Sequence, residues 1–159
     1  MSTFGTALIA LALTGAFPLT ALAEPAPPAA QPALAAATNA YFNAVNTGNT
    51  AAFNRSISAA FRVTLSDGTQ VGSGDYIGSV LARQLDRSTP VQSVRIGRTS
   101  IDGATATEIV DVSSWDNVMN GTRVNLERDT ATHRLSFVQT ADGTWLLNED
   151  HITSALHLL

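Results

Sequence analysis

Residues 133–153, HRLSFVQTADGTWLLNEDHIT, contain two runs of alternating apolar and polar side chains on either side of an Asp-Gly pair. Alternation with a period of two is typical of a strand with one buried face, and Asp-Gly between two such runs favours a tight turn. The segment therefore predicts a β-hairpin. Its apolar side chains, among them Phe137, Trp145 and Leu147, predict the buried face.

The length of the loop determines which residues of this hairpin face each other. A two-residue loop would place Phe137 opposite Asn148, whereas a three-residue loop over 141–143, with Gly143 left-handed, places it opposite Leu147. We prefer the three-residue loop because it matches apolar with apolar side chains and opposite charges, contacts worth ~0.2–1 kcal/mol each. The register that it predicts pairs Phe137 with Leu147, Arg134 with Asp150, and His133 with His151.

The period-two pattern extends back from this hairpin to Pro90. Two further turn signals, Asp102-Gly103 and Asn120-Gly121, divide it into segments of strand length. The expected strands are 91–101, 104–115, 122–139 and 144–152.

Earlier residues show apolar side chains at three- and four-residue spacing, which predicts helices. Between the second and third helix, alternation over 61–71 predicts a small hairpin. Helices followed by antiparallel strands predict an α+β domain, with three N-terminal helices packed on a curved antiparallel sheet. The expected boundary residues are Pro32 and Gly48 for the first helix, Asn49 or Thr50 for the start of the second, and Ser73 for the start of the third.

The first 32 residues differ in composition from the rest. Residues 7–23 are uncharged and apolar and end in Ala-Leu-Ala, so residues 1–23 predict a signal peptide. Residues 1–6 carry no Lys or Arg, so either the signal is weak or the true start lies upstream. A permanent membrane anchor is the alternative, but it needs ~20 apolar residues and this run contains a proline. Residues 24–32, rich in Pro and Ala, predict a tether before a domain over 33–159.

Two segments, 67–77 and 142–153, carry a resemblance to a known family. The first is an Asp-Gly turn that leads through a hairpin into a helix; the second, DGTWLLNEDHIT, is similar to the pattern D-G-x-W-x5-H-x-S, with Thr153 in place of Ser. With the order of elements, they resemble the NTF2-like superfamily (SnoaL-like and DUF4440-like domains) over about residues 33–155. The resemblance implies a cone of three helices wrapped by a bent sheet. It implies no single activity, because the superfamily includes isomerases, dehydratases and oligomerisation modules.

The composition excludes several classes of function. The chain of 159 residues contains no Cys, and all nine basic residues are Arg, which excludes a Cys nucleophile, a thiolate metal site and Schiff-base chemistry on Lys. A net charge of −4 argues against nucleic-acid binding, which needs a basic patch. The sequence contains none of the hydrolase, dinucleotide, NTPase or zinc-protease motifs. We therefore expect no cofactor.

Candidate catalytic residues lie at the far end of the predicted hairpin. The preferred register places His133, Glu149 and His151 on one face, beyond the apolar residues. An imidazole beside a carboxylate titrates near neutral pH and can transfer protons. The alternative is that these residues lie at a solvated strand end, or that His151 is a satisfied core histidine; a metal site from two His and one carboxylate is a weaker third reading.

Candidate ligand-binding residues are aromatic. Tyr41, Trp115, Phe137 and Trp145 are expected to line a pocket, with Tyr41 as a hydroxyl donor; plain core residues are the alternative. We expect Glu108 to point outward, the alternative being a buried carboxylate with a raised pKa. Charged residues around 123–129 predict a solvated strand surface.

Two functions of different class fit these observations. The first is an exported domain, secreted or periplasmic, that binds a small apolar or amphipathic ligand in its cone, or forms a homodimer through its sheet. The second is a cofactor-independent isomerase or dehydratase that uses a His or Glu group in the cone. We expect no nucleic-acid partner and no membrane association after signal cleavage.

Overall fold

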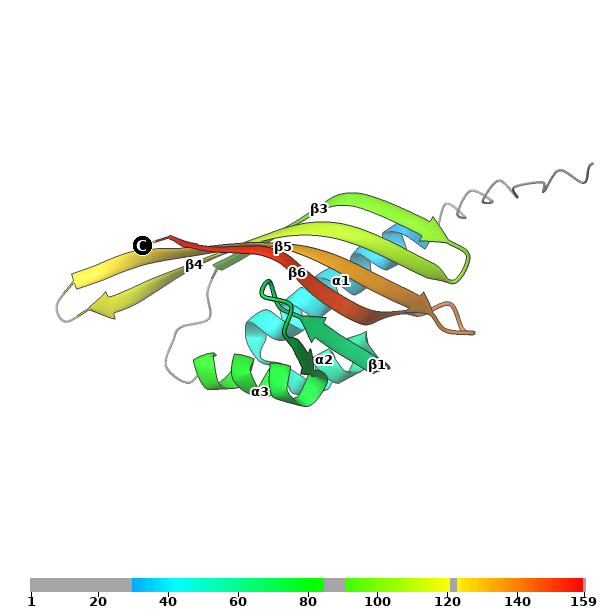
Figure 1. Cartoon of the computed structure of the whole chain (residues 1–159), viewed down its shortest axis with the longest axis horizontal. Helices are drawn as coiled ribbons and strands as arrows, with labels where there is room; N and C mark the ends of the chain where they lie inside the picture. The colour runs from blue at the N-terminus through cyan, green and yellow to red at the C-terminus, as the bar shows by residue number, and fades with distance from the viewer. Residues whose placement is uncertain (1–29, 85–90, 121–122, 159) are drawn as a thin grey trace, which may run out of the picture.

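The computed structural model describes residues 30–84, 91–120 and 123–158 (Figure 1). The predicted signal peptide and residues 24–29 of the predicted tether lie outside these ranges. The first helix begins at Ala30, so the last three residues assigned to the tether are helical. No helix among the described residues is long and apolar enough to cross a membrane.

Three helices and six strands make up the described chain, which confirms the α+β fold class. They follow the predicted order, with helices first and the long strands last. In chain order they are α1 (Ala30–Thr47), α2 (Thr50–Ser56), β1 (Ile57–Thr64), β2 (Gln70–Gly72), α3 (Ser73–Gln84), β3 (Val91–Asp102), β4 (Thr105–Asn120), β5 (Arg123–Gln139) and β6 (Trp145–Leu158).

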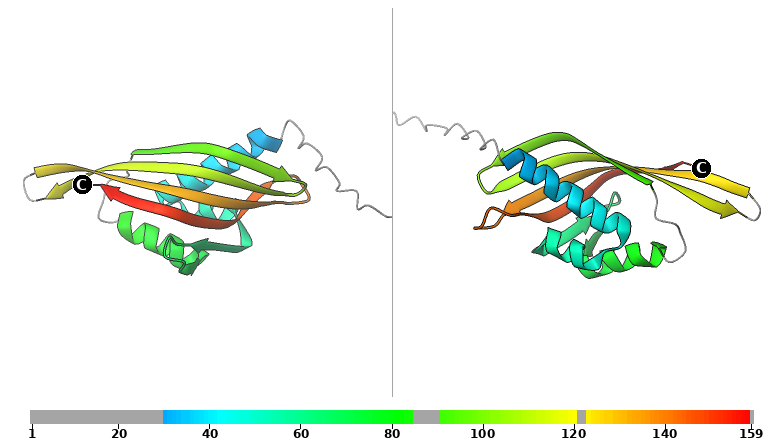
Figure 2. Two further views of the ribbon diagram at one scale, coloured as in Figure 1. Left: turned by 45° about the horizontal axis from the view of Figure 1, so that its top comes forward. Right: turned by 180° about the vertical axis from the view of Figure 1, so that it is seen from behind.

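The six strands form one sheet in the order β2-β1-β6-β5-β4-β3. The prediction of an antiparallel sheet is right for four of its five strand pairs, but β1 pairs parallel to β6 and makes the sheet mixed. The three helices lie on one side of this sheet, and α1 crosses it obliquely (Figure 2). The paired ends of β4 and β5 extend beyond the helices (Figure 1).

The core lies between α1 and the inner face of the sheet. Leu34, Tyr41 and Phe42 of α1 are buried, as are Leu135 and Phe137 of β5. These residues belong to one continuous apolar cluster, which also includes Phe53, Phe61, Val110 and Leu147. The predicted apolar periods therefore identified the correct faces of α1 and β5.

The register of β5 and β6 agrees with the prediction only next to the turn. Gly143 has a φ of 87°, and Phe137 lies opposite Leu147, as expected. The next pair is Ser136 with Glu149, so Asn148 is an extra residue in a β-bulge. The predicted pairs Arg134–Asp150 and His133–His151 are therefore wrong; Arg134 lies opposite His151, and His133 opposite Ile152.

This bulge determines which side chains enter the core. Because side chains alternate along a strand, one extra residue exchanges the two faces of the residues that follow it, here as far as a second bulge at Thr153, after which Ser154 lies opposite Thr132. Asp150, which a regular strand would place outside, is fully buried, whereas Glu149 and His151 are only partly buried.

Candidate functional site

A hydrogen-bonded group of three polar side chains, Tyr41, His133 and Asp150, lies inside the domain. They come from α1, β5 and β6 respectively, and all three are buried. We call this group the buried triad. It joins the helix layer to the sheet.

Asp150 is the centre of the buried triad. The hydroxyl of Tyr41 donates to Oδ2 of Asp150 at 2.7 Å, and Nδ1 of His133 lies 2.7 Å from Oδ1. An ionised carboxylate only accepts hydrogen bonds, so we assign the proton of the His133 contact to Nδ1. In a neutral ring this leaves Nε2 of His133 as an acceptor.

Burial raises the pKa of Tyr41 well above its usual value of 10.0, and the nearby charge of Asp150 raises it further. Both effects disfavour a phenolate, which would be a second negative charge in an apolar setting. Tyr41 is therefore a neutral hydrogen-bond donor at physiological pH.

Aromatic rings hold two members of the buried triad in place. The ring of Phe42 packs edge-on against His133, with 5.1 Å between the ring centroids. Tyr41 packs against Phe53 and Phe61, each with 6.0 Å between centroids. The triad is thus surrounded by fixed apolar groups, which favour strong hydrogen bonds.

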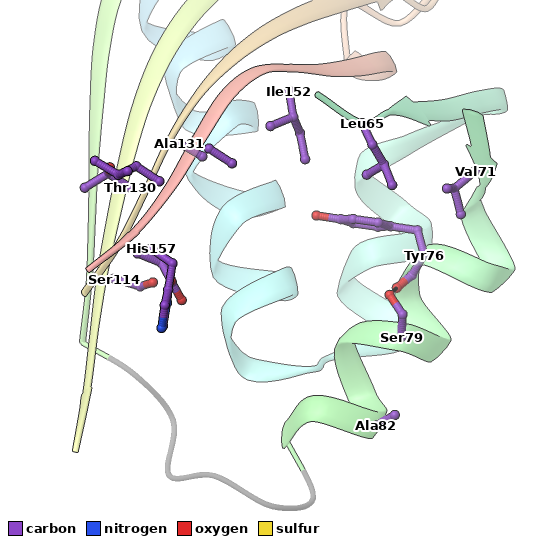
Figure 3. A pocket seen from close by; sticks show the side chains of 13 residues that line it. Leu65, Val71, Tyr76, Ser79, Ala82, Ser114, Thr130, Ala131, Ile152 and His157 are labelled. Atoms are coloured by element: carbon purple, nitrogen blue, oxygen red, sulfur yellow. Dashed lines mark hydrogen bonds and ion pairs between the residues drawn. The ribbon is translucent and has the colours of Figure 1, made fainter. Parts of the chain in front are cut away.

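A cavity of about 810 Å³ lies between α3 and the inner face of the sheet. In Figure 3 the ring of Tyr76 reaches into it from α3, near Leu65 and Ile152. We call this space the α3 cavity. It is lined by Leu65, Val71, Tyr76, Ser79 and Ala82 on one side and by Ser114, Asp129, Thr130, Ala131, Ile152, Ala155, Leu156 and His157 on the other.

The buried triad lies next to the α3 cavity without lining it. His133 is paired with Ile152 and lies two residues from Ala131 on the same strand; Ile152 and Ala131 both line the cavity. Asp150 is likewise two residues from Ile152. The triad is therefore adjacent, along the inner face of the sheet, to the residues that form the cavity wall.

The structure does not bring the three predicted catalytic residues together. His133 is buried in the triad, whereas Glu149 and His151 belong to the opposite face of β6. Glu149 lies 3.6 Å from Nε of Arg62, and Thr64 donates to it at 3.4 Å. The predicted grouping of two His and one carboxylate, as a catalytic or metal site, is therefore not formed. Among the described residues, no group of three such side chains is arranged to hold a metal.

The four predicted ligand-binding aromatics lie in four different settings, none of them in the lining of the α3 cavity. Tyr41 is in the triad and Phe137 is in the core. Trp115 lies under the guanidinium of Arg128, with 5.5 Å from Cζ to the ring centroid. Trp145 is buried and lines a second, smaller cavity of about 500 Å³ with the alanines of α1.

Glu108 is buried, with 1% of its surface exposed, so the expectation that it points outward is wrong. Its carboxylate accepts hydrogen bonds from Thr38 of α1 and, at 3.2 Å, from Thr99 of β3. Glu108 thus connects α1 to the sheet at a second point, with both carboxylate oxygens satisfied.

Sequence reasoning did not identify four residues of this region: Asp150, Tyr76, Asp129 and His157. Asp150 was assigned to the wrong face because nothing in the sequence marks the bulge at Asn148. Asp129 was treated as part of a solvated charged surface. Because adjacent residues of a strand face opposite ways, strand alternation would have placed Asp129 on the opposite face from its neighbour Arg128.

The comparisons with known proteins support the fold. No protein-family model matches this sequence, and no curated protein matches it either. Solved structures do match. One is a candidate dehydratase of the NTF2-like family from Streptomyces avermitilis, with a TM-score of 0.65 and 15% identity over 84% of this chain and 99% of that one.

Two further matches have the same architecture. A conserved protein from Planctomyces limnophilus matches with a TM-score of 0.70 and 11% identity, over 82% of this chain and 98% of that one. A candidate ketosteroid isomerase from Shewanella frigidimarina matches with a TM-score of 0.55 and 17% identity, over 76% and 94%. Structural similarity at such low sequence identity supports a shared fold but not a shared activity. The chain therefore has the NTF2-like fold.

Proposed function

We propose that this protein binds a small apolar or amphipathic molecule in the α3 cavity. The observation that carries the proposal is the cavity itself, whose volume of about 810 Å³ is within the range of small-molecule sites. Such sites combine an apolar wall with a few polar groups that orient the ligand.

The lining has both components. Leu65, Val71 and Ile152 supply apolar surface, and Ser79 and Ser114 supply hydroxyl groups. Burying an apolar group against these side chains contributes about 25 cal/mol per Å² of apolar surface removed from water. A ligand with an apolar body and a polar end fits this arrangement.

A pair of matched variants tests the proposal with the neutral dye N-phenyl-1-naphthylamine, whose fluorescence rises in apolar surroundings. Ala155→Phe places a ring in the cavity, because Ala155 lines it. We expect the dye affinity to fall at least about tenfold, equivalent to about 1.4 kcal/mol.

The control is Ser154→Phe, which adds a ring to the same strand on the other face. Ser154 lies opposite Thr132, whose neighbours Ala131 and His133 face inward. We expect its dye affinity to equal that of the wild type. Absence of dye binding by the wild type, or equal losses in the two variants, would contradict the proposal.

The buried triad favours a second candidate function, proton transfer on the bound molecule. A histidine whose Nδ1 is held by a carboxylate presents a defined Nε2 as base, an arrangement that catalytic histidines use. Here the Nδ1–Oδ1 distance of 2.7 Å and the full burial of Asp150 supply that support. In this reading Asp150 and Tyr41 are positioning residues.

Deuterium exchange separates this function from simple binding. The test uses a carbonyl compound that stays bound to the protein during purification. When the protein and this compound are incubated in D₂O, we expect the compound to gain deuterium next to the carbonyl faster than it does in buffer without the protein. His133→Gln is expected to abolish the acceleration, and His151→Gln, on the opposite face, to retain it. Unaccelerated exchange with bound compound would leave binding as the function and exclude proton transfer.

Export and homodimer formation, which the sequence and the resemblance predict, stay predictions. The residues that would direct export lie outside the described ranges. The mature chain is expected to begin at Glu24 if the predicted cleavage after Ala23 takes place.

A further inference from the structure

The charges in the lining of the α3 cavity are distributed unevenly. Asp129 and His157 are the ionisable acid and base that line it, together with the phenol of Tyr76. Among the lining residues that the structure describes there is no arginine. The formal charge of this lining is therefore −1 when His157 is neutral.

Asp129 and His157 face each other across β5 and β6. They are paired in the ladder, and Nδ1 of His157 makes a hydrogen bond to Oδ1 of Asp129. About half of each side chain is exposed, at 55% for Asp129 and 48% for His157. The second carboxylate oxygen and the other ring nitrogen thus remain within reach of a molecule in the cavity.

The nearest arginine along the chain does not neutralise Asp129. Arg128 is the preceding residue on β5, and its guanidinium lies over the ring of Trp115, its partner in the ladder. Adjacent strand residues face opposite ways, so this cation belongs to the other face of the sheet. A ligand in the cavity meets the carboxylate without that counter-charge.

The polar lining residues of the sheet lie together at one end of the cavity. Ser114, the ladder partner of Asp129, lies near His157 on the sheet side, whereas Leu65, Val71 and Tyr76 lie around the opposite end (Figure 3). A molecule that spans the cavity would place its polar end beside Asp129 and His157. A hydroxyl or ammonium group there donates to Asp129, whereas a carboxylate is repelled by it.

We propose that the α3 cavity selects amphipathic molecules whose polar end is a hydrogen-bond donor, an alcohol or a protonated amine, and discriminates against carboxylates through Asp129. This inference rests on the proposed binding function and specifies its ligand class. The discrimination comes from a half-exposed carboxylate, so it is expected to be modest and to weaken in salt.

Three compounds of equal chain length, octan-1-ol, octylammonium and octanoate, test the selectivity by displacement of N-phenyl-1-naphthylamine at pH 7. We expect the alcohol and the amine to displace the dye at concentrations about tenfold lower than octanoate. We expect the gap between octylammonium and octanoate to narrow in 0.5 M NaCl.

Asp129→Asn is expected to remove most of this gap, because it keeps the shape of the side chain and removes the charge. Asp111→Asn is the matched control. Asp111 is an exposed aspartate of β4 that accepts a hydrogen bond from Thr132 on the other face of the sheet. The Asp111→Asn variant loses the same net charge as Asp129→Asn, and we expect it to retain the difference between octanoate and the other two compounds.

The outcomes separate the two proposals. If the dye binds but octanoate competes as well as the other two, or if both Asn variants change the gap equally, the selectivity is wrong and the binding function stands. If neither the dye nor any of the three compounds binds, the binding function fails and the selectivity fails with it.

Discussion

At the scale of single residues, the buried carboxylates are the features that most constrain this molecule. Asp150 and Glu108 are almost completely buried, and each is satisfied by side-chain donors from α1 and from the sheet. A buried charge is tolerated only when it is hydrogen-bonded, so loss of one donor costs more than the bond itself. Tyr41 and His133 are therefore expected to be sensitive positions even if the protein has no catalytic activity.

Tyr41→Phe tests the role of the phenol in stability. The variant leaves Asp150 buried with one donor fewer, and hydrogen bonds to charged groups contribute ~1.5–3 kcal/mol. We expect the free energy of unfolding at pH 7, measured by urea denaturation, to fall by about that amount. A loss below ~0.5 kcal/mol would contradict the hydrogen bond.

The pKa of Tyr41 also predicts how stability depends on pH. Because the pKa is raised in the folded state, the unfolded chain loses its phenol proton first, at about the usual value of 10.0. The stabilisation is thus complete below pH 10 and decreases above it, by up to about 1.4 kcal/mol per pH unit. Urea denaturation between pH 8 and 11 is expected to show a steeper decline for the wild type than for Tyr41→Phe.

At the scale of elements, local signals predicted most helix and strand boundaries. Asn49 is the N-cap of α2 and accepts a hydrogen bond from the amide of Ala52 at 3.0 Å, and α3 begins at Ser73, as expected. These features depend on a few neighbouring residues, so the sequence contains them directly. The bulge at Asn148 has no such local signal, because it depends on how β6 fits between β5 and β1.

The cap of α2 gives a prediction at this scale. Asn49→Ala removes the side-chain acceptor and is expected to lower the free energy of unfolding by about 1 kcal/mol. Asn54→Ala, a change of the same kind at an exposed position within α2, is expected to change stability by less than ~0.5 kcal/mol. Thermal or urea unfolding of both variants measures the difference; equal effects would show that the cap contributes nothing specific.

At the scale of the whole molecule, the α3 cavity is formed by elements that lie far apart in the sequence, the β1–β2 hairpin and α3 on one side and β4, β5 and β6 on the other. The helix layer fills one part of the inner face with Leu34, Tyr41 and Phe42, while α3 lies against the next part with space between. Ala131 and Ala155 are small residues on that part of the sheet, opposite each other in the ladder. The dye-binding and selectivity experiments above address this level, since they depend on several elements at once.

The sequence by itself determined the α+β class, the order of the elements, the Asp-Gly turns and the apolar faces, because each depends on short-range periodicity or on turn chemistry. It also determined the acidic, cysteine-free composition. The tertiary structure decided that β1 joins β6 in parallel, that Asp150 rather than Glu149 or His151 faces His133, and that Asp129 and His157 border a cavity. The reason is that a bulge exchanges the two faces of a strand, that β6 has two bulges, at Asn148 and Thr153, and that only the packing of neighbouring strands determines where they form.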